Sequence, residues 1–208
     1  MKKAFKNSIL TSIVFSFLFF FTAMSYAANY EWYMNTTLGV SMKGPADWYL
    51  EMKDNPSAQA NFAFKNNPFL FAIFSKYDFK NKNNWPNPLG SAILVYLFPP
   101  ANASAMTIMA TLYSKRSNQG LTVIERPHEI KLGNQLWVVM AFRGERQGFT
   151  LYQITYVTLF PRGSVQIEAG ITDPDYNQYR KILDTFVSGI VFDTNQSNLL
   201  NNSIITGH

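Results

Sequence analysis

Apolar residues recur with the pattern of strands in some segments of the chain and with the period of a helix in others. Together these segments predict a fold of strands and helices. In the second half, apolar side chains recur over segments of strand length, and short gaps that contain glycine separate these segments. Strands joined by such short connections form an antiparallel meander. The predicted strands of the meander span residues 121–132, 135–143, 149–160 and 164–172.

The first half of the chain predicts further strands. Residues 37–43 alternate between apolar and polar side chains, as a half-buried strand does. Gly44-Pro45 is expected to break this strand, so that residues 48–53 pair with it as a hairpin or across a short turn. Two apolar runs, 69–77 and 92–98, predict buried strands.

The helical period appears in two segments. Apolar residues recur at intervals of three and four over residues 103–117, and Gly120 stands where a C-cap is expected. In the second helix, 174–190, Asp173 is the expected N-cap and Pro174 the first helical residue. Its apolar stripe predicts that it covers a sheet; the stripe consists of Tyr176, Tyr179, Leu183, Phe186, Val187 and Ile190. The residues expected on its outer side are Asn177, Arg180, Lys181 and Asp184.

The beginning of the chain has the pattern of a secretory signal peptide, residues 1–27. A basic start precedes an apolar run, 9–21, and small residues follow at Ser25 and Ala27. The run is shorter than the roughly 20 residues of a membrane-spanning helix. We therefore expect cleavage near Ala27 and a periplasmic or secreted protein.

The predicted domain organisation follows from this assignment. Residues 28–36 are expected to be a short leader into a single domain that extends over 28–193. A short helix is expected within the polar segment 55–67. Residues 194–208 are polar and rich in asparagine, which predicts a flexible tail.

Charge and cysteine content narrow the possible partners. The chain has 18 basic and 13 acidic residues, and the signal peptide holds three of the lysines, so the remainder has 15 against 13, or +2. Nucleic acid is therefore not an expected partner, because phosphate recognition needs a clustered basic surface. There is no cysteine, which excludes disulfides, thiolate metal sites and a lipid-modified cysteine. No stable membrane anchor is expected after signal cleavage.

The sequence contains no recognisable catalytic motif, and we predict no catalytic residue, metal or cofactor. The histidines are His128 and His208, and there is no G-x-S-x-G, phosphate-binding loop or calcium loop. In a regular strand, Glu125 and Glu129 would share one face and His128 the other, so a metal site would need distant carboxylates.

Candidate binding residues occur in two connecting segments. Trp85 lies in an irregular stretch, 78–90, and lysines precede it in the sequence. The hairpin tip 143–148 carries arginines. Tryptophan and arginine are enriched at binding hot spots. The alternatives are a tryptophan packed on the sheet and a solvated turn. The candidates are Lys80, Lys82, Trp85, Arg143 and Arg146.

Two motifs and the order of elements resemble the PsbP-like superfamily, which includes PsbP, a Ran-binding import factor and DcrB-type exported bacterial proteins. The motifs are "VSMKGPADW" (40–48) and "YRKILDTFVSGIVF" (179–192), and the resemblance covers residues 37–193. It implies an α+β fold: an α/β/α sandwich with a central, mainly antiparallel sheet and helices on both faces. Members of this superfamily act mostly as binding or assembly accessories and share no common catalytic site.

These observations predict an exported, soluble binding or assembly accessory protein without catalytic activity, whose partner is another exported or envelope protein. Two alternatives stay open. The aromatic content of 18 Phe, 11 Tyr and 4 Trp suits a periplasmic carrier of a small apolar or aromatic ligand, which needs an apolar pocket of roughly 300 Å³. A hydrolase would need two carboxylates that face each other in a cleft.

Overall fold

The computed structural model describes residues 30–35, 39–45, 48–53, 62–78, 91–100, 102–146, 148–172 and 176–192, with the backbone alone at 30–35, 62 and 146. The predicted signal peptide, the predicted tail and the proposed cap at Asp173-Pro174 lie outside these residues.

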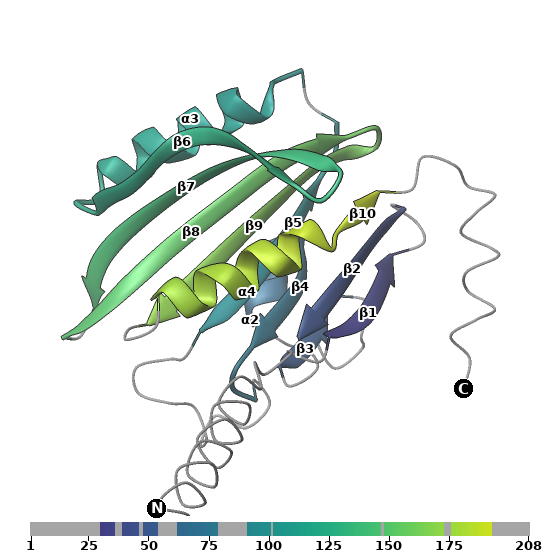
Figure 1. The fold of residues 1–208 in the computed structure, drawn as a ribbon, viewed down its shortest axis with the longest axis horizontal. Helices are drawn as coiled ribbons and strands as arrows, with labels where there is room; N and C mark the ends of the chain where they lie inside the picture. The colour runs from purple at the N-terminus through teal and green to yellow at the C-terminus, as the bar shows by residue number, and fades with distance from the viewer. Residues whose placement is uncertain are drawn as a thin grey trace, which may run out of the picture.

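A seven-stranded antiparallel sheet forms the centre of the fold, in the order β3-β4-β5-β9-β8-β7-β6 (Figure 1). The predicted meander is confirmed, because β6 to β9 pair in sequence order. The strands are β3 (Tyr49–Met52), β4 (Leu70–Ser75), β5 (Ala92–Phe98), β6 (Thr122–Leu132), β7 (Gln135–Arg146), β8 (Phe149–Phe160) and β9 (Gly163–Thr172).

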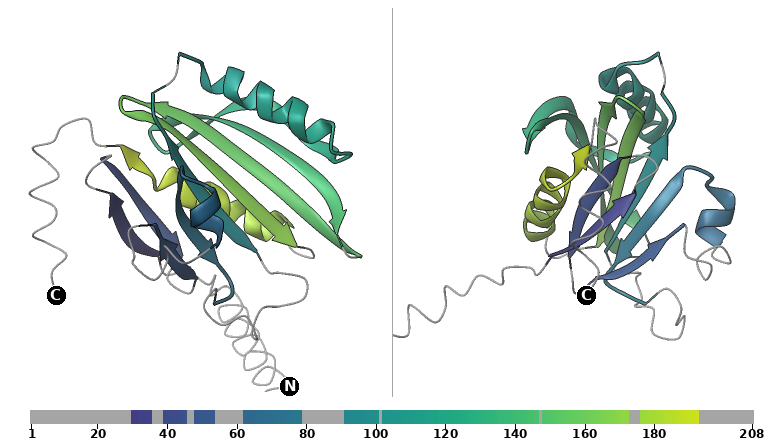
Figure 2. Two further views of the ribbon diagram at one scale, coloured as in Figure 1. Left: turned by 180° about the vertical axis from the view of Figure 1, so that it is seen from behind. Right: turned by 90° about the vertical axis from the view of Figure 1, so that its right-hand side faces the viewer.

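Helices α2 (Phe62–Asn66) and α3 (Ala105–Ser117) lie on one face of this sheet (Figure 2). Ser104 is the N-cap of α3, and its hydroxyl accepts a hydrogen bond from the Thr107 amide at 3.0 Å. Asn118 is the C-cap, and Gly120, with a φ of 75°, lies in the turn that follows. Met109 of the helix is buried against β7 and β8, where it packs with Val138, Met140, Phe142 and Val157.

Helix α4 (Tyr176–Ser188) covers the opposite face, as its apolar stripe predicts. Leu183, Phe186 and Val187 are buried in the largest core cluster, and Tyr176 and Tyr179 pack at its margin. The Phe186 ring meets Phe74 of β4 edge-on, with centroids 5.1 Å apart. The molecule is therefore an α/β/α sandwich with helices on both faces of a mainly antiparallel sheet.

A second, three-stranded sheet corrects two predictions for the beginning of the chain. It has the order β1-β2-β10, with β1 (Tyr30–Asn35), β2 (Val40–Pro45) and β10 (Val191–Phe192). The segment 28–36 is thus not a simple leader, since it contains β1. The hairpin of 37–43 with 48–53 is also wrong: β2 pairs with β1 and β10, whereas β3 pairs with β4.

The physical reason lies in the residues that β2 buries. Val40 and Met42 are almost fully buried in the core cluster that holds α4, so β2 packs on that helix and not along β3. Pro45 does not end the strand early. Because β10 reaches only Val40 and Ser41, the far end of β2 has β1 as its single neighbour among the described strands, and proline is tolerated at such a position.

Both motifs of the resemblance meet in this region. Trp48 is buried at the end of the first motif and contacts Tyr179 of the second, with ring centroids 6.3 Å apart. The motifs therefore act through packing, because they join the small sheet to α4.

Candidate functional site

The β7–β8 hairpin projects beyond the strands on either side of it. Strand β6 ends its pairing at Arg143, and β9 ends its pairing at Leu151. Past these positions β7 and β8 pair only with each other among the described residues, down to Arg146 opposite Phe149. Arg143 is exposed and the Phe149 side chain is 42% exposed, so this hairpin tip presents a cation and an aromatic ring.

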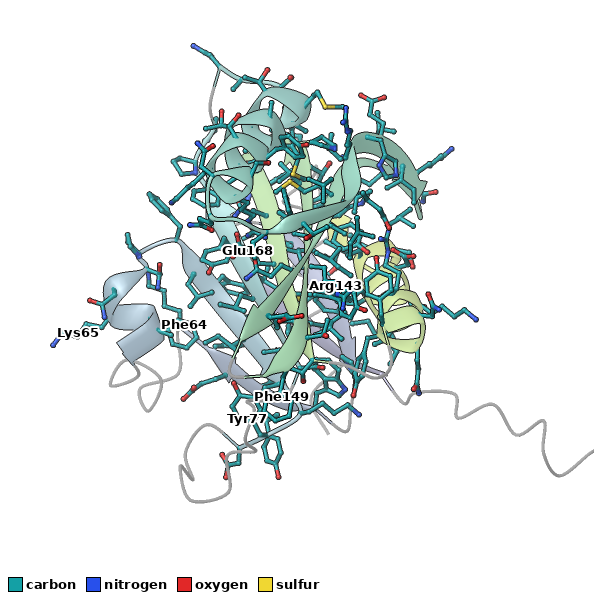
Figure 3. The ribbon with its side chains drawn as sticks, turned by 90° about the vertical axis from the view of Figure 1, so that its left-hand side faces the viewer. Phe64, Lys65, Tyr77, Arg143, Phe149 and Glu168 are labelled. Atoms are coloured by element: carbon teal, nitrogen blue, oxygen red, sulfur yellow. The ribbon has the colours of Figure 1, made fainter. Side chains whose placement is uncertain are left out.

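The other predicted binding residues belong to a segment that leaves the same end of the sheet. Lys80, Lys82 and Trp85 lie outside the described residues. The strands that flank them, β4 and β5, are joined there by a hydrogen bond from the Lys76 amide to the Ser91 carbonyl, 3.1 Å long. In Figure 3, Tyr77 and Phe149 lie close together at the lower end of the molecule, whereas Arg143 lies apart from them, toward α4.

A second candidate site, which the sequence analysis missed, is a strip of polar side chains on β9. The strip lies on the face of the strand that points away from α4. Strand β9 is the fourth of the seven strands, and its alternate residues Val165, Ile167, Ala169 and Ile171 are buried in the α4-side core. Its other face carries hydroxyl, amide and carboxyl groups and a glycine. The residues of this polar strip are Ser164, Gln166, Glu168, Gly170 and Thr172 of β9, with Gln153 and Thr155 of β8.

Arg116, from the last turn of α3, forms an ion pair with Glu168 in the polar strip. Its Nη2 lies 2.6 Å from Glu168 Oε1, and its Nη1 lies 3.4 Å from Gln153 Oε1. Gln166 Nε2 donates to the same Glu168 oxygen at 2.8 Å. The Arg116 side chain is 12% exposed and that of Glu168 28%, so the carboxylate is the more accessible partner. In Figure 3, Glu168 lies between α3 and α2.

Tyr96 of β5 borders this ion pair, since its register partner is Gln166. Burial and the nearby Glu168 carboxylate raise the pKa of the Tyr96 phenol from 10.0 to about 12, against the opposing effect of Arg116. The hydroxyl therefore stays protonated at physiological pH and can both donate and accept a hydrogen bond.

The raised pKa of Tyr96 predicts a loss of stability in alkali. The unfolded chain releases this proton near pH 10 and the folded chain near pH 12, so stability is complete below pH 10 and falls as the pH rises through this window. Urea unfolding at a series of pH values should show a smaller fall for Tyr96→Phe than for the wild type. Superimposable profiles between pH 10 and 12 would contradict the assigned environment.

A second charged cluster ties α4 to the sheet and corrects the expectation that Arg180 and Asp184 face solvent. Arg180 Nη1 lies 2.5 Å from Glu125 Oε1 of β6, and Arg180 Nε lies 3.2 Å from Asp184 Oδ1. The Tyr156 hydroxyl donates to Asp184 at 2.7 Å. The Arg180 side chain is only 15% exposed, because it lies over the Tyr156 ring at 5.5 Å.

Burial dominates the electrostatics of this second cluster. It raises the pKa of Tyr156, with further upward contributions from the hydrogen bond to Asp184 and from the carboxylates. The pKa of Tyr176 is raised for the same main reason. These phenols are therefore neutral, and the cluster serves to hold α4 in place.

The histidine and carboxylate hypotheses find no support among the described residues. Glu125 pairs with Ala141, and His128 pairs with Val139, because a bulge lies between them. The predicted common face of Glu125 and Glu129 is therefore wrong. Glu125 and Asp184 do come together, but Arg180 bridges them. Within the described ranges, no group of three potential metal-ligating side chains occurs.

A cavity of about 260 Å³ lies where the β6–β7 turn meets the end of α4. Its lining mixes turn residues with the side chains of β10, and it lies outside the central core; the residues are Gly133, Asn134, Gln135, Ser188, Ile190, Val191 and Phe192. It does not have the apolar lining that the carrier hypothesis requires. In the part of the chain that the structure describes, no helix combines the length and apolar character needed to cross a bilayer.

The architecture is that of the PsbP-like fold, as comparison with solved structures shows. The solution structure of cyanobacterial PsbP (CyanoP) from Synechocystis is 12% identical, with a TM-score of 0.53 over 82% of this chain and 96% of that one. LpqN, involved in cell envelope biogenesis of Mycobacterium tuberculosis, is 12% identical, with a TM-score of 0.50 over 80% and 86%.

The Ran-binding protein Mog1p of Saccharomyces cerevisiae has the same fold at 7% identity, with a TM-score of 0.50 over 80% of this chain and 96% of that one. No family model and no curated protein sequence matches the chain. At these identities the comparisons establish the fold, which confirms the resemblance at the level of architecture.

Proposed function

We propose that this chain is an exported binding or assembly accessory protein without catalytic activity, and that it recognises its partner with the end of the sheet that carries the β7–β8 tip. The projection of this tip beyond β6 and β9 is the main observation in favour. A two-stranded extension with an exposed arginine and an exposed Phe149 suits contact with another protein, where arginine and aromatic side chains supply much of the binding energy.

The segment with Lys80, Lys82 and Trp85 belongs to the proposed surface because it leaves β4 and returns to β5 at the same end. Arg146, at the turn of the hairpin, completes the proposed set with Arg143. A surface of mixed lysine, arginine and aromatic residues favours a partner with carboxylate groups around an apolar patch.

The roles named for proteins of the same fold support this choice. Mog1p is a Ran-binding protein, and LpqN is involved in cell envelope biogenesis. Mog1p supports a binding role, whereas LpqN and the predicted signal peptide favour an exported or envelope protein as partner, and the periplasm or the extracellular space as the place of action. Neither nucleic acid nor a membrane anchor is part of the proposal.

Partner capture from the native host tests this function. Native mass spectrometry of the protein, purified gently from the exported fraction, should show a second protein at fixed stoichiometry. Phe149→Ser combined with Arg143→Ala should raise the Kd about thirtyfold and so reduce the bound fraction, because each lost hot-spot side chain costs about 1 kcal/mol or more.

The matched control is Leu136→Ser, since Leu136 is 54% exposed and lies at the opposite end of β7. Equal loss in this control would assign the effect to general surface damage. A partner retained by the double variant would remove the hairpin tip from the proposed surface.

A further inference from the structure

The polar strip is unusual in its position. A strand at the centre of a sheet that has helices on both faces is expected to be apolar on both sides. Strand β9 is central in the sheet, but only its α4 side is apolar. Helix α3 packs on β6, β7 and β8, and α2 packs on β4, so the strip on β9 runs between the two helices (Figure 2).

Keeping polar groups at this place is unfavourable for stability. Gln166 is 9% exposed and the Arg116 side chain 12%, although desolvating one member of an ion pair commonly costs as much as the pairing returns. Thr155, opposite Glu168 in the register, is fully buried, and its Oγ1 has no hydrogen-bond partner among the described residues. An unpaired buried hydroxyl is costly, so this position too is unfavourable for stability.

The charge of the strip argues against an ionic ligand. Arg116 is matched by Glu168, so the pair contributes no net charge, and the guanidinium is too buried to meet an anion directly. What remains accessible is a set of neutral or neutralised groups: the Glu168 carboxylate, the Gln153 amide and the Tyr96 hydroxyl. These groups offer both donors and acceptors in planar side chains.

An aromatic border lies beside these groups along β5. Tyr96 and Phe98 project to the same face as Gln166 and Ser164, and their rings are 6.2 Å apart and inclined by 19°. The Phe98 ring lies 4.9 Å from that of Phe69, which is 44% exposed. Accessible aromatic rings therefore adjoin the row of planar hydrogen-bonding side chains.

We infer that the polar strip and its aromatic border bind a neutral polyhydroxylated ligand, the sugar ring of a glycan. The apolar C–H face of a sugar packs on aromatic rings, and its hydroxyls pair with amide and carboxylate groups held in fixed orientations. Arg116 and Gln166 are the positioning residues, because they fix the carboxylate of Glu168 through two hydrogen bonds. This site is separate from the hairpin tip.

Titration of the purified protein with an array of neutral mono- and oligosaccharides, followed by isothermal calorimetry on the best binder, tests the inference. Glu168→Gln is expected to weaken binding about tenfold, since it removes a charge-assisted acceptor and keeps the shape. Tyr96→Phe, which keeps the ring and loses the hydroxyl, should weaken binding about threefold. Circular dichroism establishes that each variant is folded, and Tyr96→Phe serves if Glu168→Gln does not fold.

The control is Phe149→Ala at the hairpin tip, which should leave sugar binding unchanged. Sugar binding that survives both strip variants would overturn the assignment, and so would the absence of binding by every glycan on the array. Spermidine and glutamate are titrated in parallel. If either binds in place of the sugars and loses affinity in Glu168→Gln, the ligand class is wrong. None of these results depends on partner capture by the hairpin tip.

Discussion

Replacing Phe186 by alanine is expected to lower the free energy of unfolding by about 3–5 kcal/mol, the usual cost of removing a fully buried phenylalanine. Phe186 has no exposed surface, and its ring packs edge-on against Phe74. It belongs to the core cluster that also contains Val40 and Met42 of the small sheet. The cavity would therefore open where α4, the large sheet and the small sheet meet.

Urea unfolding followed by circular dichroism measures this change. Val191→Ala is the control, because Val191 is apolar but 51% exposed, and surface substitutions usually change stability by less than about 0.5 kcal/mol. A loss below about 1.5 kcal/mol for Phe186→Ala would mean that α4 packs loosely and does not hold the two sheets together.

The strands and helices with a clear period could be predicted from the sequence. The pattern predicts residues 92–98 with the same bounds as β5, and it predicts α3 and β6 to within two residues, whereas β7 continues to Arg146, beyond the predicted end at residue 143. The spacing of apolar residues along an element indicates which of its faces is buried. The α/β/α arrangement then follows, because α3 and α4 need separate sheet surfaces.

Pairing partners and local irregularities could not be predicted in the same way. Residues 37–43 and 48–53 are neighbours in sequence, yet the burial of Val40 under α4 places them in different sheets. The bulge between Glu125 and His128 shifts the phase of β6, and a period-two argument cannot detect it. The first feature depends on a contact between distant parts of the chain, and the second on the pairing of two neighbouring strands.

The polar strip could have been predicted from the alternation of polar and apolar residues in its strand. In 164–172, the residues Gln166, Glu168 and Gly170 alternate with Ile167 and its apolar neighbours, although the flanking strands are largely apolar. Such alternation in a strand that proves to be central marks a polar face, which here runs between α2 and α3. Its partner Arg116 could not be found this way, because it comes from α3, 52 residues away in the sequence.

Replacing Arg180 by methionine is expected to lower the free energy of unfolding by about 3 kcal/mol. Removing one member of a buried ion pair commonly costs about 3–5 kcal/mol because the remaining charge is left without compensation. Here Glu125 and Asp184 would both lose their common partner, while their side chains are 27% and 32% exposed, which places the effect at the lower end. The Tyr156 hydroxyl would remain bound to a carboxylate without a counter-ion.

Urea unfolding of Arg180→Met, with Lys181→Ala as the control, measures this cost. Lys181 is adjacent on α4 and exposed, so its replacement should change stability by less than about 0.5 kcal/mol. Adding Glu125→Gln to Arg180→Met should restore more than about 1 kcal/mol, since it removes one of the two stranded charges. If the double variant is no more stable than Arg180→Met, the cost arises from lost packing of the arginine stem over Tyr156, and the cluster positions α4 by contact more than by charge.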